Sequence, residues 1–137
     1  MSDRVEKALR FKREAEEHFS NYLRHMRAGE LWKAGEYLWG AYHALLLALA
    51  NAMGKKVPAR HAALRRFVLE LADIMGDEDI YEAFKDGERL HANFYHPGLL
   101  DEEEAEEAIL HLESCISKLA DVLEQRLREL SASERTS

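Results

Sequence analysis

Three polar residues near the middle of the chain have the types and the spacing that phosphate chemistry requires: Arg89, Asn93 and His96. They step by four and by three positions, so on a helix they share one face. An imidazole can take a proton from an attacking hydroxyl, and a guanidinium can stabilise negative charge on phosphate oxygens. The spacing therefore predicts a candidate catalytic group of Arg89, Asn93 and His96.

A structural explanation of the same residues stays open. Arg89 can pair with a nearby acid such as Glu88 or Asp86, and His96 can simply end the helix. Glu88 and His91 also form a Glu-x-x-His unit of the type used by carboxylate-bridged metal bundles, but the sequence contains no second unit with that spacing. We therefore expect no metal and no cofactor.

A cluster of basic residues marks a second candidate site, near the start of the third expected helix. The free backbone amides at a helix start can receive a phosphate, so these side chains are candidates for binding RNA or another anion. The alternative is a solvated basic loop that offsets acidic charge elsewhere. The cluster consists of Lys55, Lys56, Arg60, Arg65 and Arg66.

Helical periodicity in the apolar residues predicts the elements that position these groups. Glycines and capping pairs mark the ends of five helical segments. The expected helices run from Asp3 to a stop at Gly29, from about Glu30 to Met53, from after Pro58 to Gly76, from a cap at Asp77 to just after His96, and from the pair Asp101 and Glu104 to about Leu130.

The fold class that follows is all-α, an up-and-down bundle of about five antiparallel helices. The second helix is apolar around most of its circumference, so we expect it at the centre. We expect one domain over residues 1–130 and a frayed tail over 131–137. The third helix should bury the stripe Leu64, Phe67, Val68, Leu71 and Ile74.

Charge is unevenly distributed along the 137 residues, whose net charge is −7. Residues 1–70 carry 13 basic and 8 acidic side chains, whereas residues 71–137 carry 6 basic and 18 acidic ones. This acidity argues against nonspecific binding to nucleic acid, so any such site must be local. The single cysteine, Cys115, predicts a cytoplasmic protein, because it cannot form a disulfide within the chain. We expect no membrane span, because the apolar runs are too short for one. The scarcity of Asn and Gln is typical of thermophiles.

Two segments carry a resemblance to a known family: Gly29 to Ala41, which contains Trp39-Gly40-Ala41, and Leu90 to Tyr95. Together they resemble the archaeal PaREP family, which is similar to the HEPN superfamily of helical domains. Many HEPN proteins are metal-independent ribonucleases that use an Arg and a His separated by four to six residues and paired across a dimer. Arg89 and His96 have six residues between them.

The resemblance implies a homodimer in which two copies of the fourth helix form one cleft. RNA would be cut there through attack by its 2′-hydroxyl, with Asn93 as an accessory polar group. Two hypotheses follow: a protein that binds RNA or a nucleotide and acts as a metal-independent endoribonuclease, and a non-catalytic protein-interaction module of HEPN-like fold. The first requires Arg89 and His96 to face a shared crevice.

Overall fold

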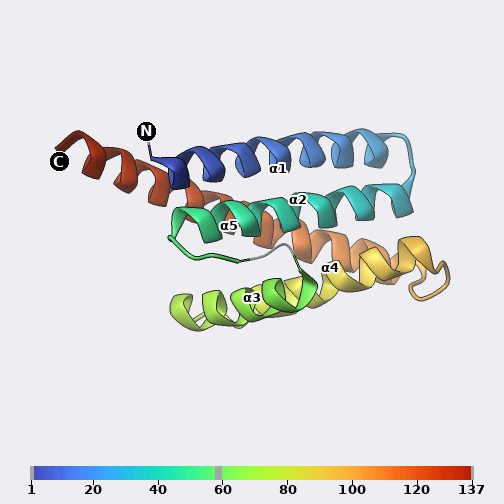
Figure 1. The fold of residues 1–137 in the computed structure, drawn as a ribbon. Helices are drawn as coiled ribbons and strands as arrows, with labels where there is room; N and C mark the ends of the chain where they lie inside the picture. The colour runs from blue at the N-terminus through green and yellow to red at the C-terminus, as the bar shows by residue number, and fades with distance from the viewer. Residues whose placement is uncertain (1, 58–59, 137) are drawn as a thin grey trace.

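Five helices form the chain in the computed structural model, which describes residues 2–57 and 60–136 (Figure 1). The expectation of an all-α bundle is confirmed, and no strand occurs within the described residues. Consecutive helices α1 and α2, α3 and α4, and α4 and α5 run in opposite directions (Figure 1). The helices are α1 (Asp3–Arg27), α2 (Leu31–Ala52), α3 (His61–Met75), α4 (Asp79–Tyr95) and α5 (Glu102–Thr136).

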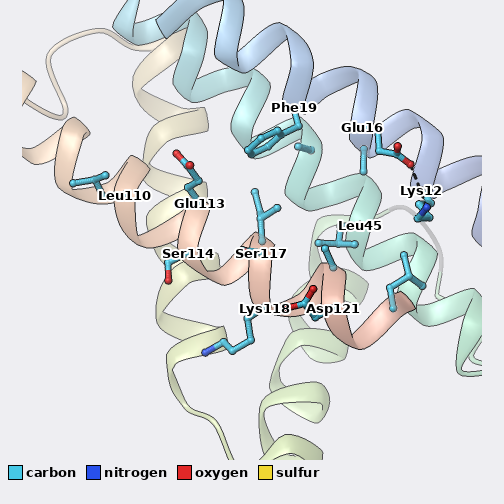
Figure 2. Close-up of a pocket in the computed structure, with 15 residues that line it drawn as sticks. Lys12, Glu16, Phe19, Leu45, Leu110, Glu113, Ser114, Ser117, Lys118 and Asp121 are labelled. Atoms are coloured by element: carbon cyan, nitrogen blue, oxygen red, sulfur yellow. Dashed lines mark ion pairs between the residues drawn. The ribbon is translucent and has the colours of Figure 1, made fainter. Parts of the chain in front are cut away.

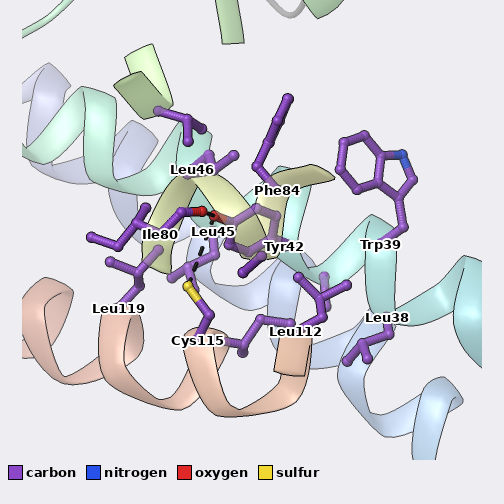
Figure 3. Packing of buried hydrophobic residues seen from close by; sticks show 14 of the residues in the cluster. Leu38, Trp39, Tyr42, Leu45, Leu46, Ile80, Phe84, Leu112, Cys115 and Leu119 are labelled. Carbon is purple, nitrogen blue, oxygen red and sulfur yellow. Dashed lines mark hydrogen bonds between the residues drawn. The ribbon is translucent and has the colours of Figure 1, made fainter. Parts of the chain in front are cut away.

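The second helix lies at the centre, as its apolar circumference predicts. It packs against α1 along its length and also contacts α4 and α5. Tyr42 is fully buried here, and its hydroxyl donates to the backbone oxygen of Ile80 at 3.1 Å (Figure 3). Burial raises the pKa of the nearby Cys115 thiol to about 11, so the only cysteine is a neutral packing residue.

Close packing between α2 and α4 depends on a glycine. A Cβ atom built at Gly87 would lie 2.5 Å from Cε3 of the buried Trp39 ring, closer than carbon atoms can approach. Because Gly87 has no side chain, the indole packs directly on the α4 backbone. This contact fixes the position of α4 and of the polar residues that it carries.

The helix ends mostly follow the predicted signals. Asp101 and Glu104 form the expected capping box, each side chain accepting from the other's backbone N–H at 2.8 and 3.1 Å. The start of α1 differs: Ser2 is the N-cap, and its hydroxyl accepts from the Val5 N–H. Asp77 precedes the N-cap of α4 and accepts from the Asp79 N–H, and the expected break at Pro58 lies outside the described residues.

Two expectations about the ends of the core need correction. Ile74 was expected in the α3 stripe, yet it is 59% exposed, because α3 packs mainly on α4 and Ile74 lies outside that contact. The fifth helix continues past the expected end at Leu130 to Thr136. Its extension passes the start of α1, where the Ser2 N–H donates to Glu134 at 3.0 Å. No helix in the described part of the chain is long and apolar enough to cross a membrane.

Candidate functional site

Arg89 lies on the polar side of α4 and forms an ion pair with Asp86, one turn earlier on the same helix. The Arg89 side chain is 57% exposed, whereas the Asp86 carboxylate is mostly buried. A guanidinium in an ion pair must exchange its carboxylate for a phosphate before it can act on a substrate. The pairing with Asp86 is the structural alternative that the sequence left open.

His111 of α5 holds the other side of the Asp86 carboxylate. Its Nδ1 lies 2.5 Å from Asp86 Oδ2, and its Nε2 lies 2.6 Å from Asp79 Oδ1. Partial burial lowers the pKa of His111, but the hydrogen bonds and charges of Asp86 and Asp79 outweigh that effect and raise it overall. Both ring nitrogens are engaged, so the imidazolium ties α4 to α5.

Asn93 points into the protein. It is 2% exposed, and its side-chain oxygen accepts from the backbone N–H of Leu100 at 2.9 Å. This bond satisfies a buried donor in the connection between α4 and α5. Asn93 therefore does not join Arg89 at the surface, although the two residues lie one turn apart.

His96 is the exposed residue that ends α4. Its backbone has left the helical conformation (φ −130°, ψ 76°), and its N–H donates to Ala92 at 2.8 Å. The seven positions from Arg89 to His96 correspond to roughly 10 Å along a helix axis. The structure thus brings two of the three predicted residues to the surface of α4 and turns the third inward.

The predicted basic cluster is partly neutralised. Lys55 pairs with Glu70, and Arg65 pairs with Glu88 at 2.5 Å. The other three cations have no ion-pair partner within the described residues and lie exposed around the first turn of α3: Lys56, Arg60 and Arg66. This surface retains positive charge that an anion can reach.

The Glu-x-x-His unit of α4 does not converge on a metal. Glu88 is turned to His61 and Arg65 of α3, whereas His91 lies 2.9 Å from both carboxylate oxygens of Glu36 on α2. The two members of the unit therefore face different helices. In the described part of the chain, no three or more His, Cys, Asp or Glu side chains are arranged so that they could hold a metal ion.

A large hollow lies elsewhere, between α1 and α5, with α2 as its floor (Figure 2). Its volume is about 870 Å³, and its lining is mainly apolar. We call it the α1/α5 groove. Small side chains create it, because one alanine from each surrounding helix faces a space that larger residues would fill. Its apolar lining includes Ala15 and Phe19 of α1, Ala41 and Leu45 of α2, and Ile116 and Ala120 of α5.

Two polar links join the walls of the α1/α5 groove. Lys12 of α1 pairs with Glu124 of α5 at 2.9 Å, and the buried Tyr22 of α1 donates to Glu113 of α5 at 2.5 Å. Burial, followed by the hydrogen bond to Glu113 and its charge, raises the pKa of Tyr22, so the phenol stays protonated as the donor. These links set the width of the groove.

The sequence pattern gives no indication of this groove. Ala15 and Phe19 fit an ordinary core stripe of α1, and the pattern carries no sign that the stripe is only half covered. The sequence feature that marks the groove is one alanine in each wall and one in the floor. These alanines indicate a hollow only when the positions of the three helices are known.

The fold and the site define a class: a small all-α bundle with an open apolar groove on one side and an ion-paired polar face on α4. The chain belongs to the archaeal PaREP1/PaREP8 family, whose family model matches residues 3–116. The match includes α1 to α4 and ends within the α5 wall of the groove. Searches of curated proteins and of solved structures gave no match.

Proposed function

We propose that this PaREP1/PaREP8-family chain is a non-catalytic protein-interaction module that binds its partner in the α1/α5 groove. The observation that carries the proposal is the groove itself: about 870 Å³ of mainly apolar space, open to solvent between two long helices. An exposed apolar surface of this kind typically marks a binding site, since burying it is favourable. Leu110 at its edge is 69% exposed, which is a high exposure for a leucine side chain.

The polar face of α4 supports the same conclusion by contrast. Arg89 is paired with Asp86, and Asn93 serves the backbone of Leu100. Groups that already satisfy one another contribute to stability and need no ligand to explain them.

Selection of helical peptides from a displayed library tests the proposal. The chain is expected to enrich peptides with an apolar face, and the same selection on Ala120→Leu, which fills the groove, is expected to enrich none of them. The matched control is Ala62→Leu, because Ala62 is an exposed alanine on α3 outside the groove. Peptides that bind wild type and Ala120→Leu equally would contradict the proposal.

A second candidate function is that of a homodimeric, HEPN-like, metal-independent endoribonuclease with Arg89 and His96 as its catalytic residues, because Asn93 is turned inward to Leu100. One observation favours it: Arg89 and His96 are both accessible on the surface of α4. The exposed cations Lys56, Arg60 and Arg66 would then contribute to RNA binding.

Cleavage of single-stranded RNA in EDTA separates the two candidates. The interaction module is expected to give no product above the background of a His96→Ala variant. The nuclease instead predicts products with cyclic phosphate ends, which His96→Ala abolishes without a change in melting temperature. That result would replace the first proposal by the second.

A further inference from the structure

The α1/α5 groove has the shape of a vacant helix position. Two helices form its walls and a third forms its floor, so a further helix laid over the groove, along both walls, would complete a four-helix arrangement. The links from Lys12 and Tyr22 to α5 are ten residues apart on α1, which corresponds to roughly 15 Å. That length accommodates three apolar anchors of an amphipathic helix, at positions i, i+3 or i+4, and i+7.

The charge on the groove rim is acidic. Three carboxylates line the groove: Glu16, Glu113 and Asp121. The lining contains two amines, and both are already engaged: Lys12 lies between Glu16 and Glu124, and Lys118 turns away to Asp77 at 2.5 Å (Figure 2). Within the described residues, no cation pairs with Glu113 or Asp121. A basic occupant would supply the missing partners.

The same charges disfavour a second copy of the chain in this groove. A two-fold dimer places the same surface of both subunits in contact, so the acidic rim of one groove would face the acidic rim of the other. Like charges brought together at an interface weaken association. RNA is disfavoured for the same reason, because its phosphates would face carboxylates.

We infer that the α1/α5 groove binds a basic amphipathic helix of another protein, an assignment that rests on the interaction module proposed above. Apolar residues on one face of this helix occupy the hollow formed by Ala15, Ala41 and Ala120. Lysine or arginine residues flanking that face pair with Glu113 and Asp121. The links between α1 and α5 fix the separation of the two walls before binding, which lowers the ordering cost of complex formation.

Three matched peptides test the inference by isothermal titration calorimetry on the full chain. All three carry the same apolar face and a side-chain crosslink on the outer face, since short isolated helices are marginal in water. Their flanking residues are lysine, glutamine or glutamate. We expect the lysine peptide to bind about tenfold more tightly than the glutamine peptide, and the glutamate peptide to bind most weakly. Added salt should reduce these differences.

Three groove variants, two of them with a matched control, define where the peptides bind. Ala120→Leu should abolish binding of all three peptides, whereas Ala62→Leu should not. Asp121→Lys should weaken the lysine peptide about tenfold and strengthen the glutamate peptide. Glu17→Lys makes the same change in charge on α1 outside the groove, and the affinity for each peptide should stay within about twofold of wild type. Asp121→Asn, a milder variant, should reduce the lysine preference, and circular dichroism verifies the fold of each variant.

The outcomes that overturn the inference are distinct. If the glutamine or glutamate peptide binds as tightly as the lysine peptide or more tightly, the partner is not basic. The proposed function as an interaction module is then unaffected. Failure of all three peptides, or full binding to Ala120→Leu, would overturn both. A dimer by sedimentation that Ala120→Leu converts to a monomer would assign the groove to a second copy of this chain.

Discussion

The polar face of α4 and the α1/α5 groove differ in how completely their groups are satisfied. On α4, Asp86 forms ion pairs with Arg89 and His111, and Asn93 accepts a hydrogen bond from the backbone N–H of Leu100. In the groove, apolar surface faces solvent, and Asp121 has no ion-pair partner among the described residues. The difference indicates that the polar face of α4 stabilises the fold, while the groove is available for binding.

The largest effect on stability is expected from Asp86→Ala. This substitution leaves Arg89 without its carboxylate and His111 with only Asp79, and hydrogen bonds to charged groups are worth about 1.5 to 3 kcal/mol each. The free energy of unfolding should fall by about 3 kcal/mol in urea denaturation. A loss below about 0.5 kcal/mol, the usual range for surface substitutions, would mean that the α4 face is not structural.

A smaller loss is expected from Asn93→Ala, which removes the acceptor of the buried Leu100 N–H. An unsatisfied buried donor costs about 1 to 3 kcal/mol, so we expect a loss of about 2 kcal/mol. Asn51→Ala is a useful control, because the Asn51 amide donates only to the preceding turn of its own helix. Equal losses in the two variants would argue against a special role for the bond to Leu100.

A pH dependence is expected from His111. Its folded-state pKa is raised, so its contribution to stability is complete below the unfolded value of about 6.5 and is lost as the pH rises through the folded value. The free energy of unfolding should therefore decrease from about pH 6.5 upward. His111→Gln should remove this decrease. An unchanged profile in that variant would exclude His111 as its source.

The smallest effect on stability is expected in the groove. Ala120→Leu adds apolar atoms to a half-buried position and removes no hydrogen bond. We expect the free energy of unfolding to stay the same or to rise by about 1 kcal/mol at most, measured by the same urea titration. A loss above about 1 kcal/mol would indicate overpacking, and hence that the groove closes in solution.

Local signals predicted much of this fold. Gly76 adopts the left-handed conformation that ends α3, and Asp101 with Glu104 starts α5 as expected. The pairing of Arg89 with Asp86 was foreseen as an alternative. These features involve neighbours in the chain, so a sequence pattern is sufficient to identify them.

The fate of Asn93 shows where helical spacing is insufficient. At 100° per residue, Asn93 lies about 40° to one side of Arg89 and His96 about 20° to the other. The boundary of the buried surface of α4 passes between Asn93 and Arg89. Asn93 is therefore buried, while Arg89 and His96 are exposed. The position of that boundary depends on how α5 packs, which spacing within one helix does not record. The groove was missed for a related reason, since it exists only between helices.

Chemical-shift mapping on the ¹⁵N-labelled chain distinguishes a binding groove between α1 and α5 from an RNA site on α4. Two ligands are titrated separately, the lysine-flanked amphipathic peptide and a single-stranded RNA oligonucleotide. We expect the peptide to perturb the amides of Phe19, Ser117 and Asp121 in the groove, and RNA to leave those of Arg89 and His96 unchanged. Perturbation of Arg89 and His96 by RNA, with no response of the groove to the peptide, would instead assign binding to the polar face of α4.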